Sequence, residues 1–150
     1  MAVDPNALSD VKQLRQLMKN AHERDREDLV LACQLRIAKL KGLEFSDVLE
    51  REFWQAVACA EEFKTIENGK TTRLSRTRQK YERVGAKQCL ADWANDPKLT
   101  DGFRILIRAG HPEYTGEAVV VRHADLFDSA TVEAAKAKLL ANGANIGMFS

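Results

Sequence analysis

The segment SDVLEREFWQAVACAEEFKTIEN, at residues 46–68, has the spacing of one long α-helix. Its apolar residues recur at intervals of three and four, which places them on one side of a helix. These residues are Leu49, Phe53, Val57, Ala60 and Phe63, with Trp54 broadening the same side. Within residues 46–63 the only basic residue, Arg51, stands against Asp47, Glu50, Glu52, Glu61 and Glu62. We therefore expect a helix with one buried side and an acidic outer face.

Two shorter helices precede this segment and are expected to form an antiparallel hairpin across residues 1–42. Apolar residues at intervals of three and four run from Leu8 to Ala21 and from Leu29 to Leu40. Asp25 is the expected N-cap of the second helix, because a short side chain with an acceptor oxygen is favoured at that position. The short connection HERD predicts that the two helices are antiparallel neighbours.

The stretch from Phe103 to His123 fits two interpretations. FRILIRA alternates apolar and basic residues and EAVVVRH is rich in valine, which is typical of a small β-hairpin across 103–122. Two short helices are the favoured interpretation, because Thr100 and Thr115 suit N-cap positions and Gly110 suits a helix stop. A lone hairpin would also need a surface to cover it.

The chain as a whole is predicted to be all-α, a single compact domain of about six to eight helices. With 150 residues, it is long enough to bury a core without metal or disulfide bonds. We expect a helical domain at 1–143, divided into the hairpin at 1–42, the acidic helix at 46–68, a basic helical segment at 70–96 and C-terminal helices at 100–143, with a short tail at 144–150. Cys33, Cys59 and Cys89 show no pairing motif and are expected to be buried reduced thiols.

The chain shows no sign of a membrane segment or a secretory signal. No apolar run approaches the roughly 18 residues that a spanning helix needs. The first residues, MAVDPNALSD, have neither a basic start nor an apolar stretch. We expect a cytoplasmic protein that does not contact membranes.

Basic residues are concentrated in KTTRLSRTRQKYERVGAK, residues 70–87. This segment holds seven of the 23 Lys and Arg residues and one of the 22 Asp and Glu residues. On one continuous helix, the cations spaced by three and four would form a single row. They are Arg73, Arg76, Lys80, Arg83 and Lys87. Such a row weakens a helix unless it faces water or an anion, so it indicates contact with a polyanion. Arg78 projects away from the row and is expected to pair with an acid of the preceding helix.

These features predict a small bacterial-type DNA-binding protein that acts as a homodimer, without enzymatic activity, cofactor or metal. The expected nucleic-acid contacts are Lys70, Arg73, Arg76, Gln79, Lys80, Arg83 and Lys87. Most would bind phosphates, and Gln79 would read a base edge. The alternative is a helical protein–protein adaptor or self-association module that uses opposed acidic and basic faces. DNA is not distinguished from RNA by these residues.

The basic helix is expected from about Arg73 to Val84, and Gly85 either ends it or lies within a longer helix. A helix-turn-helix with Gly85 at the turn fits poorly, because bulky Tyr81 stands where a small residue is needed for the helices to pack. Trp54 and Trp93 fall at apolar helical positions, which favours core packing over stacking on bases.

No catalytic motif is present in the local sequence. The three histidines are scattered, so no converging set of metal ligands is predicted. The eight glycines occur singly, without the glycine-rich turn of a nucleotide-binding loop. An enzyme assembled from distant segments stays as a third interpretation.

Overall fold

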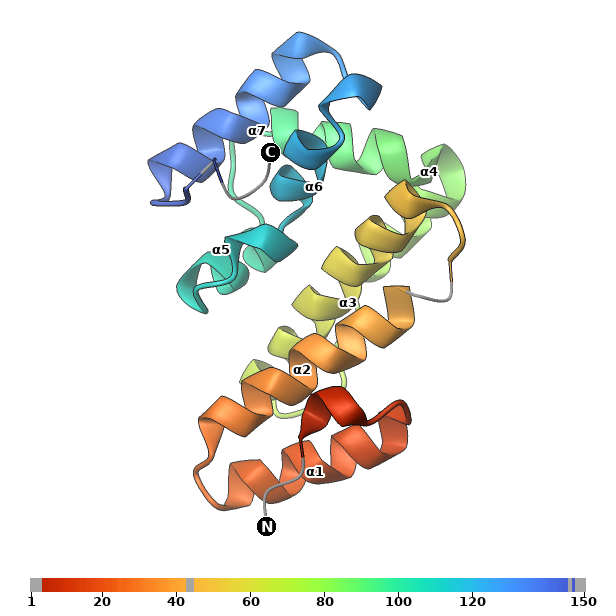
Figure 1. The fold of residues 1–150 in the computed structure, drawn as a ribbon. Helices are drawn as coiled ribbons and strands as arrows, with labels where there is room; N and C mark the ends of the chain where they lie inside the picture. Colours follow the sequence, from red (N-terminus) through yellow and green to blue (C-terminus); the bar gives the residue numbers. More distant parts are fainter. Residues whose placement is uncertain (1–3, 43–44, 146, 148–150) are drawn as a thin grey trace.

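The long helix expected from the sequence lies at the centre of the molecule (Figure 1). The computed structural model describes residues 4–42, 45–145 and 147. In it α3, Val48–Asn68, packs against α2, α4, α5 and α6. Phe53 and Val57 belong to one buried cluster, whereas Ala58 and Cys59 belong to another. The helix is therefore enclosed on more than one side, which its small residues permit because they allow close helix–helix approach.

The described residues contain seven α-helices and no strand. The α-helices are α1 Val11–Glu23, α2 Glu27–Gly42, α3 Val48–Asn68, α4 Ser75–Asn95, α5 Asp101–Arg108, α6 Gly116–Arg122 and α7 Ser129–Ala141. Three short 3-10 turns are also described: η1 Pro5–Ala7 precedes α1, η2 Pro112–Tyr114 lies between α5 and α6, and η3 Ala124–Leu126 lies between α6 and α7. The prediction of a single all-α domain is confirmed.

Residues 103–122 form α5, η2 and α6, so the β-hairpin interpretation of this stretch is wrong. The expected N-caps explain the helical outcome. The Thr100 hydroxyl accepts a hydrogen bond from the Phe103 amide at 3.1 Å, and the Thr115 hydroxyl accepts one from the Ala118 amide at 3.1 Å. Each cap satisfies a backbone donor that a new helix leaves unpaired.

The chain opens with α1 and α2, which lie side by side and run in opposite directions (Figure 1). Leu14 and Met18 of α1 form a small core with Cys33 and Ile37 of α2. The prediction that Asp25 caps α2 is wrong. Asp25 has a φ of 56°, a left-handed turn conformation, and the Arg26 carbonyl accepts the hydrogen bonds from the amides of residues 29 and 30.

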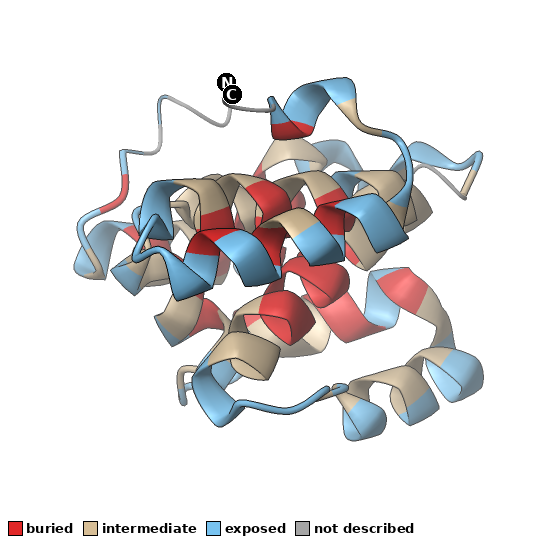
Figure 2. Cartoon of the chain, turned by 90° about the horizontal axis from the view of Figure 1, so that it is seen from below, coloured by how far each residue is buried: buried red, intermediate tan, exposed pale blue. Residues whose placement is uncertain are grey.

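The main core lies among α3, α4, α6 and α7, with Phe103 of α5 packed into it. Figure 2 shows the buried residues gathered where the helices face one another. Asp128 caps α7 by accepting a hydrogen bond from the Thr131 amide at 2.8 Å. Ala144 is buried against this core, so the expected tail at 144–150 begins with a docked residue. Residues 146 and 148–150 of that tail lie outside the described residues.

The prediction of an acidic outer face on α3 is wrong for Glu61 and Glu62, which are 4% and 3% exposed. Both carboxylates are buried with cationic partners. Glu62 accepts two hydrogen bonds from Arg15 of α1, at 2.7 and 3.0 Å, and Lys41 of α2 lies 3.6 Å away. These pairs tie α3 to the opening hairpin, because a buried carboxylate without a partner would be costly.

All three cysteines are buried and free, as expected. Among the described residues, no helix has both the length and the apolar character that crossing a membrane requires.

Candidate nucleic-acid interface

The basic segment begins in a loop rather than on a helix. Lys70 and Arg73 precede α4, which starts at Ser75 instead of Arg73. Arg76 and Arg83 lie on the first part of the helix, before a break at Gly85. The five cations spaced by three and four therefore do not form one straight row, because the loop and the break separate its two ends.

Gly85 divides α4 into two limbs, Ser75–Val84 and Ala86–Asn95. Its φ of 84° and ψ of 172° lie outside the helical region and in a region that is essentially restricted to glycine. An ion pair between Lys80 and Asp92 crosses this break. In a straight helix these residues would be about 18 Å apart along the axis, farther than the two side chains can reach. The limbs are therefore bent toward each other on the side that carries Lys80.

The second limb packs one face into the protein. Its Ala86, Cys89, Leu90 and Ala94 are buried in the main core. Two helices joined at a glycine do occur here, as in the helix-turn-helix interpretation. However, one face of the second limb is packed into the core, and at its start only Lys87 and Gln88 are exposed.

Arg78 anchors the first limb to α3, as the sequence predicts. Its Nη2 and Nε atoms donate to the Glu61 carboxylate at 2.7 and 2.8 Å, and the Leu74 amide donates to the same carboxylate at 2.8 Å. The guanidinium also lies over the Trp54 ring, 5.1 Å from its centroid. Burial alone would raise the pKa of Glu61, but the hydrogen bonds from Arg78 and Leu74 outweigh it and leave that pKa lowered.

Most of the predicted contact residues are exposed and free of internal partners. Within the described part of the chain, this set makes no hydrogen bond or ion pair through its side chains: Lys70, Arg73, Arg76, Gln79, Arg83 and Lys87. Lys80 differs, because it is half-buried and its hydrogen bond to Asp92 lowers the pKa of that carboxyl group. Lys80 is thus already paired within the protein, whereas the other cations are free to bind an external anion.

The structure adds cations that the sequence analysis did not select. A shallow hollow at the start of α4 is lined by Arg73, Arg76 and Lys64 of α3. Next to it, Lys64 also lines a second hollow together with Arg104 and Arg108 of α5. Arg104 and Arg108 are exposed and have no partner among the described residues. Their spacing of four on a predicted helix was the available signal, but nothing in the sequence places α5 beside Lys64 of α3.

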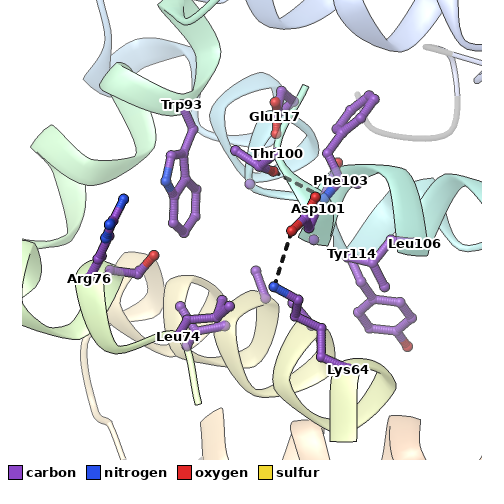
Figure 3. A pocket seen from close by; sticks show the side chains of 17 residues that line it. Lys64, Leu74, Arg76, Trp93, Thr100, Asp101, Phe103, Leu106, Tyr114 and Glu117 are labelled. Carbon is purple, nitrogen blue, oxygen red and sulfur yellow. Dashed lines mark hydrogen bonds and ion pairs between the residues drawn. The ribbon is translucent and has the colours of Figure 1, made fainter. Parts of the chain in front are cut away.

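A cavity of about 380 Å³ opens beside the start of α4 (Figure 3). Arg76 and Trp93 lie on one side of it, and Lys64 lies on the opposite side, 3.3 Å from Asp101. Glu117 lines the cavity and pairs with Lys138 at 3.3 Å. Burial raises the pKa of Glu117. Lys64 and Arg76 line both this cavity and the shallow hollow at the start of α4. The cavity therefore adjoins the surface that carries the free cations.

No group of three or more metal-binding side chains converges in the described ranges 4–42, 45–145 and 147. The histidines instead contact single carboxylates. His22 lies 3.2 Å from Glu27, His111 lies 2.8 Å from Glu113, and His123 hydrogen-bonds to Glu52.

Comparison of the chain with models of known protein families, with curated proteins and with solved structures found no match. The interface is therefore interpreted from its own geometry and charge.

Proposed function

We propose that this protein binds nucleic acid, with DNA as the ligand, through phosphate contacts made by the basic surface around α4. The observation that carries the proposal is the set of exposed cations without internal partners. They are Lys70, Arg73, Arg76, Arg83 and Lys87, and Arg104 and Arg108 extend the surface onto α5. Cations left unpaired in this number suit a polyanion.

Phosphate contacts predict a characteristic dependence on salt. Each contact releases condensed counterions, so the logarithm of the binding constant falls with the logarithm of salt concentration, with a slope of about −0.9 per contact on duplex DNA. Five such contacts give a slope of about −4.5 on a duplex and about −3.5 on a single strand. Gln79 is exposed between Arg76 and Arg83, and we propose that it meets a base edge or a sugar.

The alternative adaptor function depends on an exposed acidic face, which the structure does not favour. Glu61 and Glu62 are buried against Arg78 and Arg15. Glu50 accepts a hydrogen bond from the Tyr81 hydroxyl at 2.6 Å. Because these carboxylates have partners within the chain, the basic surface has more charge to offer a ligand than the acidic helix does.

The proposal includes a homodimer in the bacterial cytoplasm. Two exposed apolar side chains support self-association: Val84 is 46% exposed and Leu126 is 45% exposed. Both line a hollow that also contains Lys87, so a second copy seated there would bring two basic surfaces near each other. Two linked binding surfaces raise the overall affinity without new contacts.

Binding assays across a salt series test the proposal. Fluorescence anisotropy with duplex and single-stranded probes should show affinity that falls steeply with salt. The double variant Arg76→Glu with Arg83→Glu should lose binding and keep its circular dichroism spectrum. Lys12→Glu with Lys19→Glu is the matched control, because these exposed lysines lie on α1 and carry the same change of charge. Binding by the Arg76/Arg83 variant equal to that of the parent would refute the proposed interface.

A further inference from the structure

The cavity beside Arg76 has the size and lining of a site for a small organic group. Its volume of about 380 Å³ lies at the lower end of the range of roughly 300–1,000 Å³ typical of such sites. Apolar groups form much of its wall, including Val57 of α3, Trp93 of α4 and Phe103 of α5. A few polar groups, among them Thr77 and Glu117, interrupt this apolar lining.

The Trp93 wall is held in place from several directions. Its ring stacks on Phe53 with the centroids 5.5 Å apart and the planes 16° from parallel. The Trp93 carbonyl accepts a hydrogen bond from Lys138. Gly116 approaches the ring so closely that a Cβ atom at this position would collide with it. A rigid aromatic wall is already formed, so a ligand does not have to organise it.

The charge at the cavity mouth defines the second half of the ligand. Arg76 lines the cavity and is exposed without a partner, and Arg73 lies in the adjoining hollow. Lys64 is partly neutralised by Asp101, at 3.3 Å. The net positive charge at the mouth therefore comes from Arg73 and Arg76. A ligand with an apolar planar body and an attached anion matches this arrangement.

We propose that the cavity takes one unpaired base of a bound nucleic-acid strand, with the adjacent phosphate at Arg73 and Arg76. This inference rests on the proposed function, since the same cations hold the backbone. A base in a duplex is stacked and paired, so it must leave the helix, at a cost, before it can enter a cavity. In a single strand the bases are already unpaired, so a base enters the cavity at little cost. The protein therefore prefers single-stranded to duplex nucleic acid.

Three probes with the same number of phosphates separate base binding from phosphate binding. They are a fluorescently labelled oligothymidylate, an oligomer of abasic deoxyribose phosphate, and a duplex with matched phosphate number. We expect the oligothymidylate to bind at least about fivefold more tightly than the abasic strand, because base–aromatic contacts are favourable by this order or more. Tryptophan emission should change with oligothymidylate and not with the abasic strand.

A cavity-filling variant gives a second measurement. Thr77 is half-buried on the first turn of α4 and lines the cavity, so Thr77→Phe should fill it. We expect this variant to bind oligothymidylate and the abasic strand with equal affinity. If Thr77→Phe does not fold, the comparison of the probes with the parent protein still decides the question.

The outcomes distinguish the two proposals. Equal binding of base-bearing and abasic strands, lost in the Arg76/Arg83 variant, would overturn the base site and leave phosphate binding intact. No binding of any probe would overturn the proposed function and this inference together. Thymidine monophosphate tests whether the cavity binds a free nucleotide instead of a base within a strand. If it binds as tightly as the oligomer, the proposal of a strand-borne base is refuted.

Discussion

The Arg78 guanidinium meets the buried Glu61 carboxylate through two hydrogen bonds, 2.7 and 2.8 Å long, and thereby fixes α4 on α3. This pair separates two uses of positive charge within one basic segment. Arg78 stabilises the fold, whereas Arg76, two residues earlier, is exposed and lines the mouth of the cavity. The two arginines therefore allow structural and binding effects to be measured independently.

Arg78→Ala should destabilise the protein by about 2–3 kcal/mol. Removing one partner of a buried ion pair leaves the other charge uncompensated, which costs up to about 3–5 kcal/mol for fully buried pairs. The expected loss of stability lies at or below the lower end of that range, because the Arg78 side chain is 32% exposed. Urea denaturation measures the change. Arg76→Ala is the matched control and should leave the midpoint of urea unfolding unchanged. Equal stability of the two variants would contradict the role of Arg78 as an anchor between α4 and α3.

The effect of Arg78→Ala should depend on pH. The pKa of Glu61 in the folded protein is lowered from its ordinary value of 4.5, so its stabilising contribution is complete above that value. It is lost as the pH falls through the folded-state pKa and the carboxylate takes up a proton. Without Arg78, burial raises the pKa of Glu61 in the folded variant, so the variant's unpaired carboxylate takes up a proton at a higher pH than the parent's. The stability difference between parent and variant should therefore be largest near pH 7 and shrink as the pH falls toward about 4. A difference that grows with acid would contradict this assignment.

Gly85→Ala should destabilise the protein by about 1–3 kcal/mol, because alanine cannot adopt the backbone angles of Gly85 without strain. Thermal unfolding measures this cost. Gly69→Ala is a useful comparison, since its φ of 71° and ψ of 12° are left-handed helical and cost alanine less, about 1 kcal/mol. A Gly85→Ala variant as stable as the parent would mean that α4 runs straight and that Lys80 does not reach Asp92.

Local signals in the sequence were sufficient for much of the fold. Thr100 and Thr115 were predicted as N-caps and act as such, because a cap contacts residues only three positions away. Asp25 failed although it has the right chemistry, since the turn between α1 and α2 places it in a left-handed conformation. Cap chemistry alone does not determine where a tight turn ends.

The candidate interface was only partly predictable, because its members come from distant segments. Glu62 was placed on the surface because its partner, Arg15, is 47 residues away. Arg104 and Arg108 were not selected because the packing that brings α5 beside Lys64 of α3 is a property of the folded chain. Arg78 was assigned correctly, since its direction on the helix differs from that of Arg76 and an acidic helix immediately precedes it.

The salt dependence of binding should distinguish Lys80, which is paired with Asp92, from Arg83 and Arg104, which have no internal partner among the described residues. Arg83→Ala should reduce the magnitude of the salt slope by about 0.7 on a single strand or 0.9 on a duplex, the value of one phosphate contact. Arg104→Ala should do the same, because Arg104 extends the proposed interface onto α5. Lys80→Ala should leave the slope unchanged, because its charge is already paired with Asp92. The measurement is anisotropy at five or more salt concentrations for each variant. A loss of slope in Lys80→Ala equal to that in Arg83→Ala would show that the bound phosphate displaces Asp92, and would restore Lys80 to the row of contacts predicted from the sequence.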